Sequence, residues 1–202
     1  MFTYDTTLDP SASNTSHRQF LELVGDHRSV LDVGCSLGAM PRRLSECGFR
    51  GIGLEVDAAL ARKASFLSGV PVYTTLEEVA ASEGPLGAVV MYDVFEHLYH
   101  PVAFVKALGA LLAPGGVLVL ETFRTDSPAF SRDGLGHEDV KPIEHPFMYR
   151  LDHIEALLRR AGFTPLRVQR PLGDDHARVR VAARRDGAAA GLALPIIGAL
   201  PS

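Results

Sequence analysis

The feature that most constrains this chain is residues 29–38, SVLDVGCSLG, an apolar run followed by an acid and two glycines four positions apart. The apolar half predicts a buried parallel strand. Gly34 and Gly38 allow the backbone to turn sharply and to approach a ligand, and the helix expected next presents its N-terminus to that ligand. The segment therefore predicts a strand, a loop and a helix that together cradle a small molecule.

Two acids beside this loop narrow the choice of ligand. The carboxylate of Asp32 would repel a pyrophosphate but suits a ligand with ammonium and sulfonium charges, as in S-adenosylmethionine. Glu55 ends a second predicted strand, 21 residues after Gly34, where an acid accepts hydrogen bonds from both hydroxyls of a ribose. Dinucleotide sites share this acid, but their fingerprint has glycine where this chain has Ser36.

Strand and helix signals alternate from about residue 17 to about residue 170, which predicts an α/β fold with a doubly wound, Rossmann-like sheet. The last two β-type runs are joined by a connection too short for a crossover helix, so we expect an antiparallel hairpin at the C-terminal end. The predicted strands are 29–33, 51–55, 70–74, 86–92, 117–123, 163–170 and 177–184. The predicted helices are 38–47, 58–67, 76–81, 101–112 and 151–161, preceded by one with the apolar face Phe20, Leu21 and Val24.

Two segments depart from this alternation. Residues 124–149 are polar, aperiodic and longer than ordinary connections, which predicts a cover over the functional site. Residues 187–202 are apolar but interrupted by glycine and proline, and too short to span a bilayer. For this tail three alternatives stay open: docking on the protein's own surface, docking on a second subunit in a homodimer, and disorder. We expect residues 1–186 to form one domain.

Composition excludes several classes of protein. The 202 residues, 47% hydrophobic and 22% charged, fit one globular domain. The net charge of −4 provides no basic stripe, so no nucleic-acid partner is expected. No signal peptide or membrane segment is visible, and two cysteines are too few for a disulfide framework. These observations predict a cytoplasmic protein.

Four ordered motifs carry a family resemblance. In order and spacing they resemble those of class I S-adenosylmethionine-dependent methyltransferases, over about residues 17–185: VLDVGCSLG (30–38), GIGLEVD (51–57), VVMYDVFEHL (89–98) and LLAPGGVLVLET (111–122). The DxxEHL stretch and the later PxEHPFMY are similar to small-molecule members of the ubiquinone-type O-methyltransferase kind. The resemblance implies a seven-stranded sheet with one antiparallel strand near its C-terminal end. It also implies O-methylation of a small-molecule acceptor in a biosynthetic pathway, with S-adenosylmethionine as cofactor and S-adenosylhomocysteine as product.

The resemblance also implies which residues bind the cofactor. Glu55 would hold the ribose. Asp93 would bind the amino group and, with the chain around it, form the floor of the site near the sulfonium. Where such proteins usually have an aspartate for the adenine, this chain has Thr75 and Leu76, so Thr75 or Glu77 would take that contact. The methionine end of the cofactor would be held by four residues, Asp32, Gly34, Ser36 and Gly38. His17 matches a segment that in similar proteins folds over the cofactor.

A proton acceptor is needed when the methyl acceptor is a hydroxyl. Histidine titrates near neutral pH, so we rank His145 first, then His97 and His137. The competing interpretation is structural, with His97 hydrogen-bonded at a helix start and His145 anchoring the cover. The polar residues between 137 and 145 match no standard metal-ligand spacing, so we expect a solvated loop and no metal.

Two other functions stay open at this stage. A nicotinamide-dependent oxidoreductase would share the sheet, the glycine loop and Glu55, although Ser36 and the terminal hairpin disfavour it. A non-catalytic adenosylmethionine-binding subunit is suggested by the altered adenine position and the apolar tail.

Overall fold

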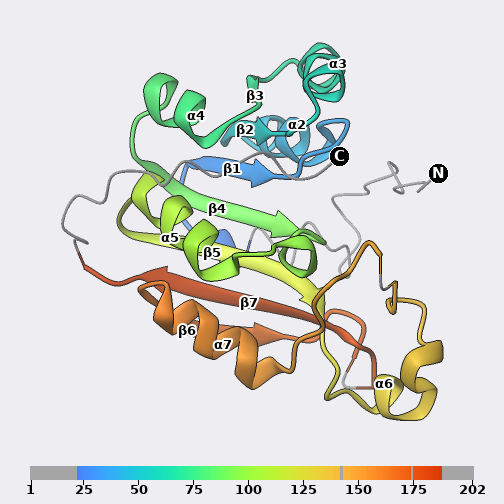
Figure 1. The fold of residues 1–202 in the computed structure, drawn as a ribbon. Helices are drawn as coiled ribbons and strands as arrows, with labels where there is room; N and C mark the ends of the chain where they lie inside the picture. Colours follow the sequence, from blue (N-terminus) through green and yellow to red (C-terminus); the bar gives the residue numbers. More distant parts are fainter. Residues whose placement is uncertain (1–21, 142, 174, 188–202) are drawn as a thin grey trace.

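The computed structural model describes residues 22–141, 143–173 and 175–187 (Figure 1). Its centre is a seven-stranded sheet with the strand order β3-β2-β1-β4-β5-β7-β6. The strands are β1 (Ser29–Val33), β2 (Arg50–Leu54), β3 (Val72–Tyr73), β4 (Leu86–Tyr92), β5 (Leu112–Phe123), β6 (Phe163–Gln169) and β7 (Arg178–Arg185). The first five are parallel, and β7 runs antiparallel between β5 and β6. The predicted sheet and its C-terminal hairpin are therefore confirmed.

The order of the strands determines where a ligand can bind. From β1 the chain moves outward to β2 and β3, then returns to place β4 on the other side of β1. The connections after β1 and β4 therefore leave in opposite directions. In open sheets of this kind, ligands bind at the carboxyl ends of the strands beside such a reversal.

Helices cover both faces of the sheet. They are α2 (Ala39–Glu46), α3 (Ala58–Ser68), α4 (Leu76–Ser82), α5 (Pro101–Leu111), α6 (Pro128–Asp133) and α7 (Leu151–Arg160), with 3₁₀ turns η1 (Phe95–His97) and η2 (Gly134–Gly136). One core cluster joins α4, α5 and α7 to the sheet, and the second joins α2 and Val24 to the opposite face. Successive strand residues such as Val30 and Leu31 enter different clusters, as the period of two requires. Phe20 and Leu21, expected to precede Val24 on one helix, lie outside the described residues.

The segment 124–149 is more regular than its sequence predicts. It contains α6, whose first turn is capped by the Ser127 hydroxyl accepting the Phe130 N–H at 3.0 Å. Its ends are tied together, because the Thr125 N–H donates to the Tyr149 carbonyl at 2.8 Å. Figure 1 shows this closed loop beyond the carboxyl ends of β4 and β5. That position is compatible with the expected cover, and α6 within it was not predicted from the sequence.

Two strands differ from expectation by more than one residue at a boundary. β5 begins at Leu112 instead of 117, since Leu112 pairs with Leu86 ahead of an irregularity in the ladder. β3 has two residues instead of five, at the edge of the sheet. The tail from 188 lies outside the described residues. No helix in the described part of the chain is long and apolar enough to cross a membrane.

The packing of α2 on β2 yields a stability prediction. A Cβ at Gly51 would lie 2.1 Å from the Pro41 carbonyl oxygen, whereas one at Gly84 would meet nothing within 4 Å. Gly51→Ala should therefore lower the free energy of unfolding by about 1–3 kcal/mol through overpacking, and Gly84→Ala should change it by less than about 0.5 kcal/mol. Urea denaturation measures both values. Equal midpoints for the two variants would contradict the packing described for Gly51.

Candidate active site

The loop after β1 is held by the end of β2. The N–H groups of Gly34 and Cys35 both donate to the Leu54 carbonyl, at 2.8 and 3.1 Å. The Glu55 carboxylate accepts the Ser36 N–H through Oε2 and the Asp57 N–H through Oε1, both at 3.1 Å. Each oxygen keeps a lone pair, so Glu55 anchors the loop and still has acceptors for the two hydroxyls of a ribose.

Backbone strain marks the same place. Among the described residues, the non-glycine residues with positive φ are Ser36 and Asp93, each at 49°. Ser36 lies in the loop after β1, and Asp93 directly follows β4. Such conformations cost about 1–3 kcal/mol and are concentrated at functional sites. Both residues were predicted to contact the cofactor.

The two loops are packed against each other. A Cβ at Gly34 would lie 2.6 Å from Cγ2 of Val94, and the φ of Gly34 is 73°. Glycine is therefore required at position 34 by both conformation and space. Gly38 has a different constraint, since a Cβ there would lie 3.0 Å from Cβ of Ser68 on α3. The structure gives Gly38 a role in helix packing, while its contact with a cofactor stays a prediction.

Asp32 lies beneath the loop with 4% of its surface exposed. Burial, and secondarily the charge of Glu55, raise the pKa of the Asp32 carboxyl to about 8. A cationic ligand nearby would offset that cost by favouring the ionised carboxylate. The contact of Asp32 with a cofactor stays a prediction.

Thr75 and Leu76, which were expected near the adenine, also stabilise the fold. Thr75 caps α4: its hydroxyl accepts the Glu78 N–H at 3.1 Å, and the Glu78 carboxylate accepts the Thr75 N–H at 3.3 Å. The hydroxyl can still donate one hydrogen bond outward. The side chain of Leu76 is buried in the core, which leaves only its backbone for a ligand. His17 lies outside the described residues.

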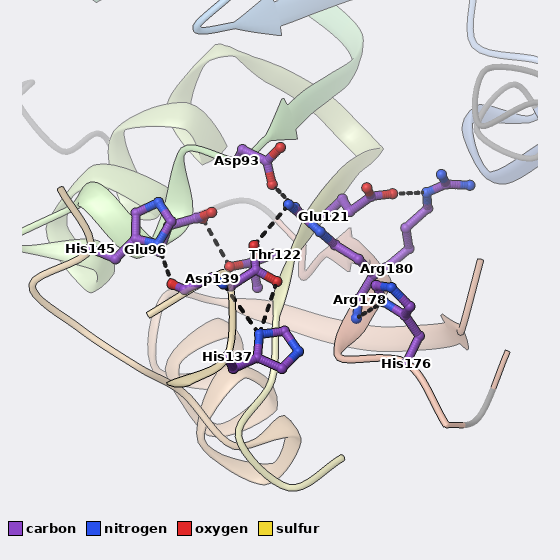
Figure 2. A network of polar contacts seen from close by, with 10 residues as sticks. All are labelled: Asp93, Glu96, Glu121, Thr122, His137, Asp139, His145, His176, Arg178 and Arg180. Atoms are coloured by element: carbon purple, nitrogen blue, oxygen red, sulfur yellow. Dashed lines mark hydrogen bonds and ion pairs between the residues drawn. The ribbon is translucent and has the colours of Figure 1, made fainter. Parts of the chain in front are cut away.

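Arg178, at the start of β7, connects this site to the cover. Its guanidinium pairs with the carboxylate of Asp93 and donates to Oδ1 of Asp139 at 3.1 Å (Figure 2). The side chain of Asp139 is 7% exposed, and burial raises the pKa of its carboxyl. Sequence reasoning missed Arg178, although arginine in a strand of otherwise apolar character was the available signal.

The three histidines named as proton acceptors take different positions. The rings of His97 and His145 lie edge to face, with centroids 4.8 Å apart. Nδ1 of His145 donates to the Asp139 carbonyl at 2.7 Å, and Nδ1 of His97 donates to the Glu144 carbonyl, because a carbonyl can only accept. His137 lies on the other side of Asp139, where its Nδ1 accepts the Asp139 N–H at 3.2 Å (Figure 2).

Burial corrects the expectation of a solvated loop here. His137, Asp139 and His145 are all less than a tenth exposed. They are the buried residues of the cover itself, and the His145 ring lies 5.5 Å from that of Phe123. The local sequence is polar, but these three side chains bond to one another, to backbone or to Arg178, and are removed from water.

Glu96 joins the pair of histidines from the 3₁₀ turn after β4. It is 1% exposed and accepts a hydrogen bond from the Thr122 hydroxyl at 2.8 Å (Figure 2). Burial raises the pKa of its carboxyl, an effect opposed first by hydrogen bonds from its own backbone N–H and from Thr122, and then by the nearby His97 and His145. Its signal in the sequence was the DxxEH stretch.

A second buried ion pair lies across the adjoining strands. Arg180, on β7, is fully buried and donates to the carboxylate of Glu121, its direct partner on β5. The guanidinium also lies 5.6 Å from the centre of the Tyr92 ring. This pair was not expected from the sequence, because pairing of β5 with β7 across the sheet was not apparent from local pattern.

Comparison with known proteins identifies the class. A family model described as a methyltransferase domain matches residues 8–168. The match covers most of the chain, so this protein belongs to that methyltransferase family. Together with the sheet and the cradle, it confirms the prediction of a class I S-adenosylmethionine-dependent methyltransferase and disfavours the nicotinamide oxidoreductase alternative.

Curated relatives are similar over part of their length. A ubiquinone biosynthesis O-methyltransferase of Xanthomonas euvesicatoria is 34% identical over 127 residues, which are 59% of this chain and 52% of that protein. One from Dinoroseobacter shibae is 27% identical over 149 residues, 68% of this chain and 60% of that protein. The chain thus spans between half and three fifths of these two relatives.

Solved structures share the fold. A methyltransferase of Thermotoga maritima, a possible histamine N-methyltransferase, superposes with a TM-score of 0.65 at 18% identity, covering 84% of this chain and 87% of that one. The 1,6-didemethyltoxoflavin-N1-methyltransferase of Burkholderia thailandensis, solved with bound 1,6-didemethyltoxoflavin and S-adenosylhomocysteine, gives a TM-score of 0.63 at 18% identity, covering 84% of this chain and 76% of that one. At this identity they support the fold alone.

The raised pKa of Asp32 predicts a pH-dependent stability. Burial raises the pKa of Asp32 to about 8 in the folded protein, above the ordinary aspartate value of about 3.8. A group of this kind stabilises the fold at low pH and loses that contribution as pH rises between the two values. The free energy of unfolding of the wild type minus that of Asp32→Asn should therefore fall from pH 5 to pH 8 and level off above. Denaturant titrations of both proteins measure this difference, and a constant value would contradict the buried state of Asp32.

Proposed function

We propose that this protein transfers a methyl group from S-adenosylmethionine to a hydroxyl of a small-molecule acceptor in a biosynthetic pathway, releasing S-adenosylhomocysteine. The observation that carries the proposal is the cradle at the strand reversal. There, two strained residues, Ser36 and Asp93, and the anchored Glu55 surround one end of β1.

The charge around the cradle fits this cofactor. Asp32, Glu55 and Asp93 provide three carboxyl groups at the ends of β1, β2 and β4. They complement an ammonium and a sulfonium, and would repel a pyrophosphate. Asp93 already pairs with Arg178. The amino group of the cofactor must therefore share the Asp93 carboxylate with the Arg178 guanidinium.

The acceptor is proposed to bind beneath the cover formed by residues 124–149. The loop lies beyond the ends of β4 and β5 (Figure 1), and two of its histidines, His137 and His145, are buried. The choice of a hydroxyl acceptor is supported by these histidines and by the O-methyltransferase names of the curated relatives.

When bound, S-adenosylmethionine supplies a methyl group activated by its sulfonium. The chain must hold the acceptor oxygen in line with that methyl, about 3 Å away, and exclude water, an arrangement that contributes about 7–11 kcal/mol. The hydroxyl proton passes to a base as the oxygen–carbon bond forms. His145 suits this role, because its Nδ1 is protonated toward Asp139 and Nε2 therefore carries the lone pair.

The other two histidines rank lower. His97 has the same tautomer as His145 and is the next choice. In His137 the Asp139 N–H occupies the lone pair of Nδ1, so the neutral ring carries its proton on Nε2 and has no free acceptor. His137 is better suited to hold Asp139 in place than to accept a proton.

Glu55→Ala should weaken S-adenosylhomocysteine binding roughly 10- to 150-fold, because hydrogen bonds to a charged group contribute about 1.5–3 kcal/mol. Isothermal titration calorimetry measures the change. Glu46→Ala removes an exposed carboxylate on α2 and serves as the control with unchanged affinity. The proposal fails if the wild type does not bind S-adenosylhomocysteine. Equal affinities in Glu55→Ala and Glu46→Ala would show that Glu55 does not contact the ligand.

His145→Ala should lower turnover by about 10²–10⁴-fold, the usual contribution of a general base, with S-adenosylhomocysteine affinity nearly unchanged. The assay needs an acceptor, found by screening metabolites for a gain of one methyl group by mass spectrometry. His153→Ala, an exposed histidine on α7, is the matched control. A loss confined to acceptor KM would instead identify His145 as an anchor of the cover.

A further inference from the structure

Glu96, His97 and His145 form a cluster that the reaction above does not fully explain. One potential ligand atom from each, a carboxylate oxygen and two imidazole nitrogens, lies within 4.8 Å of the other two. The first two residues come from the turn after β4, and the third from the cover, 48 residues further along the chain. Only the tertiary fold brings these three side chains together.

Each member of the cluster is oriented by a second group. Both imidazoles donate an Nδ1–H to a backbone carbonyl, of Glu144 and of Asp139, so Nε2 of each ring bears the lone pair. The Glu96 carboxylate is held by the Thr122 hydroxyl. Outer partners of this kind, a carbonyl behind each histidine and a donor behind the carboxylate, are how proteins orient metal ligands.

The charge balance of the cluster points the same way. Glu96 is 1% exposed, and none of the ion pairs in the described part of the chain joins it to an arginine or a lysine. No hydrogen bond among the described residues joins Glu96 to either imidazole. A buried carboxylate normally has a cation as partner. A metal ion among these three groups would supply it.

We propose that Glu96, His97 and His145 bind a divalent transition-metal ion of the zinc type. Two imidazoles and one carboxylate suit such an ion, whereas Mg²⁺ and Ca²⁺ prefer oxygen ligands alone. Ligands at about 2.0–2.2 Å from a tetrahedral ion stand about 3.4 Å apart, so side-chain rotation must close the cluster by about 1.5 Å at most. Three protein ligands leave a further position for water or acceptor.

Binding of the ion does not depend on the proposed function. Any role of the ion in methyl transfer does rest on that function. An ion at this site occupies the same His145 lone pair that is proposed to accept a proton. It also cross-links the cover to the end of β4. The sequence predicted no metal because spacing was compared only within residues 137–145, whereas the structure draws two of the three ligands from the 3₁₀ turn.

The test is direct metal binding by the full chain, with any affinity tag removed. Calorimetry with Zn²⁺ alone should give one ion per chain. His97→Gln and His145→Gln retain a donor for the carbonyls and should each raise the dissociation constant by more than the ~10–100-fold expected for loss of an outer partner. His153→Gln, exposed on α7, should leave it unchanged.

A second measurement needs no variant. X-ray absorption of the zinc-loaded wild type should show two imidazole nitrogens and oxygen ligands at about 2.0–2.2 Å. The proposal is overturned by an absence of stoichiometric binding, by equal affinity in His97→Gln, His145→Gln and wild type, or by equal loss in His153→Gln. S-adenosylhomocysteine affinity is measured on the same samples, so failure of the metal site and failure of the proposed function are separate results.

Discussion

The site depends on a close approach of two loops that only glycine at position 34 permits. There is no room for a Cβ at Gly34 because Val94, from the loop after β4, occupies that space. The contact brings the ends of β1 and β4 together at the point where the strand order reverses. Glu55 then holds the first loop through the Ser36 N–H, so a single arrangement places three carboxyl groups around one cradle.

Buried charge organises the other half of the site. Arg178 joins Asp93, at the cradle, to Asp139, in the cover. Asp139 is buried, so loss of Arg178 would leave its carboxylate without this cationic partner. The cover is thereby coupled to the cofactor side of the site by electrostatics, and to the end of β5 by the backbone bridge between Arg124 and Tyr149. The same principle applies to Glu96, since this buried carboxylate has two histidines beside it but forms no ion pair with an arginine or lysine of the described residues.

Several parts of the fold were predictable because their physics is local. The apolar run of β1, the helix capped by Asp57 and the termination of α5 before Pro114 depend on neighbours within a few residues. The cradle was predictable for the same reason, since its glycines and Glu55 occupy one strand–loop–helix–strand unit. The segment 124–149 was not, because its polar side chains are satisfied by partners distant in sequence, such as Arg178 for Asp139.

The sequence by itself determined the class of protein, the order of strands and helices, and the strand–loop–helix–strand unit that contains Gly34 and Glu55, because each follows from periodicity or from a motif within a few tens of residues. Only the tertiary structure decided which histidines meet, which tautomer each adopts and which acid joins them. It did so because the ring of His145 is oriented by a carbonyl of its own loop, while its neighbours His97 and Glu96 arrive from the end of β4. Such contacts depend on how the cover closes over the sheet, and no local pattern encodes that.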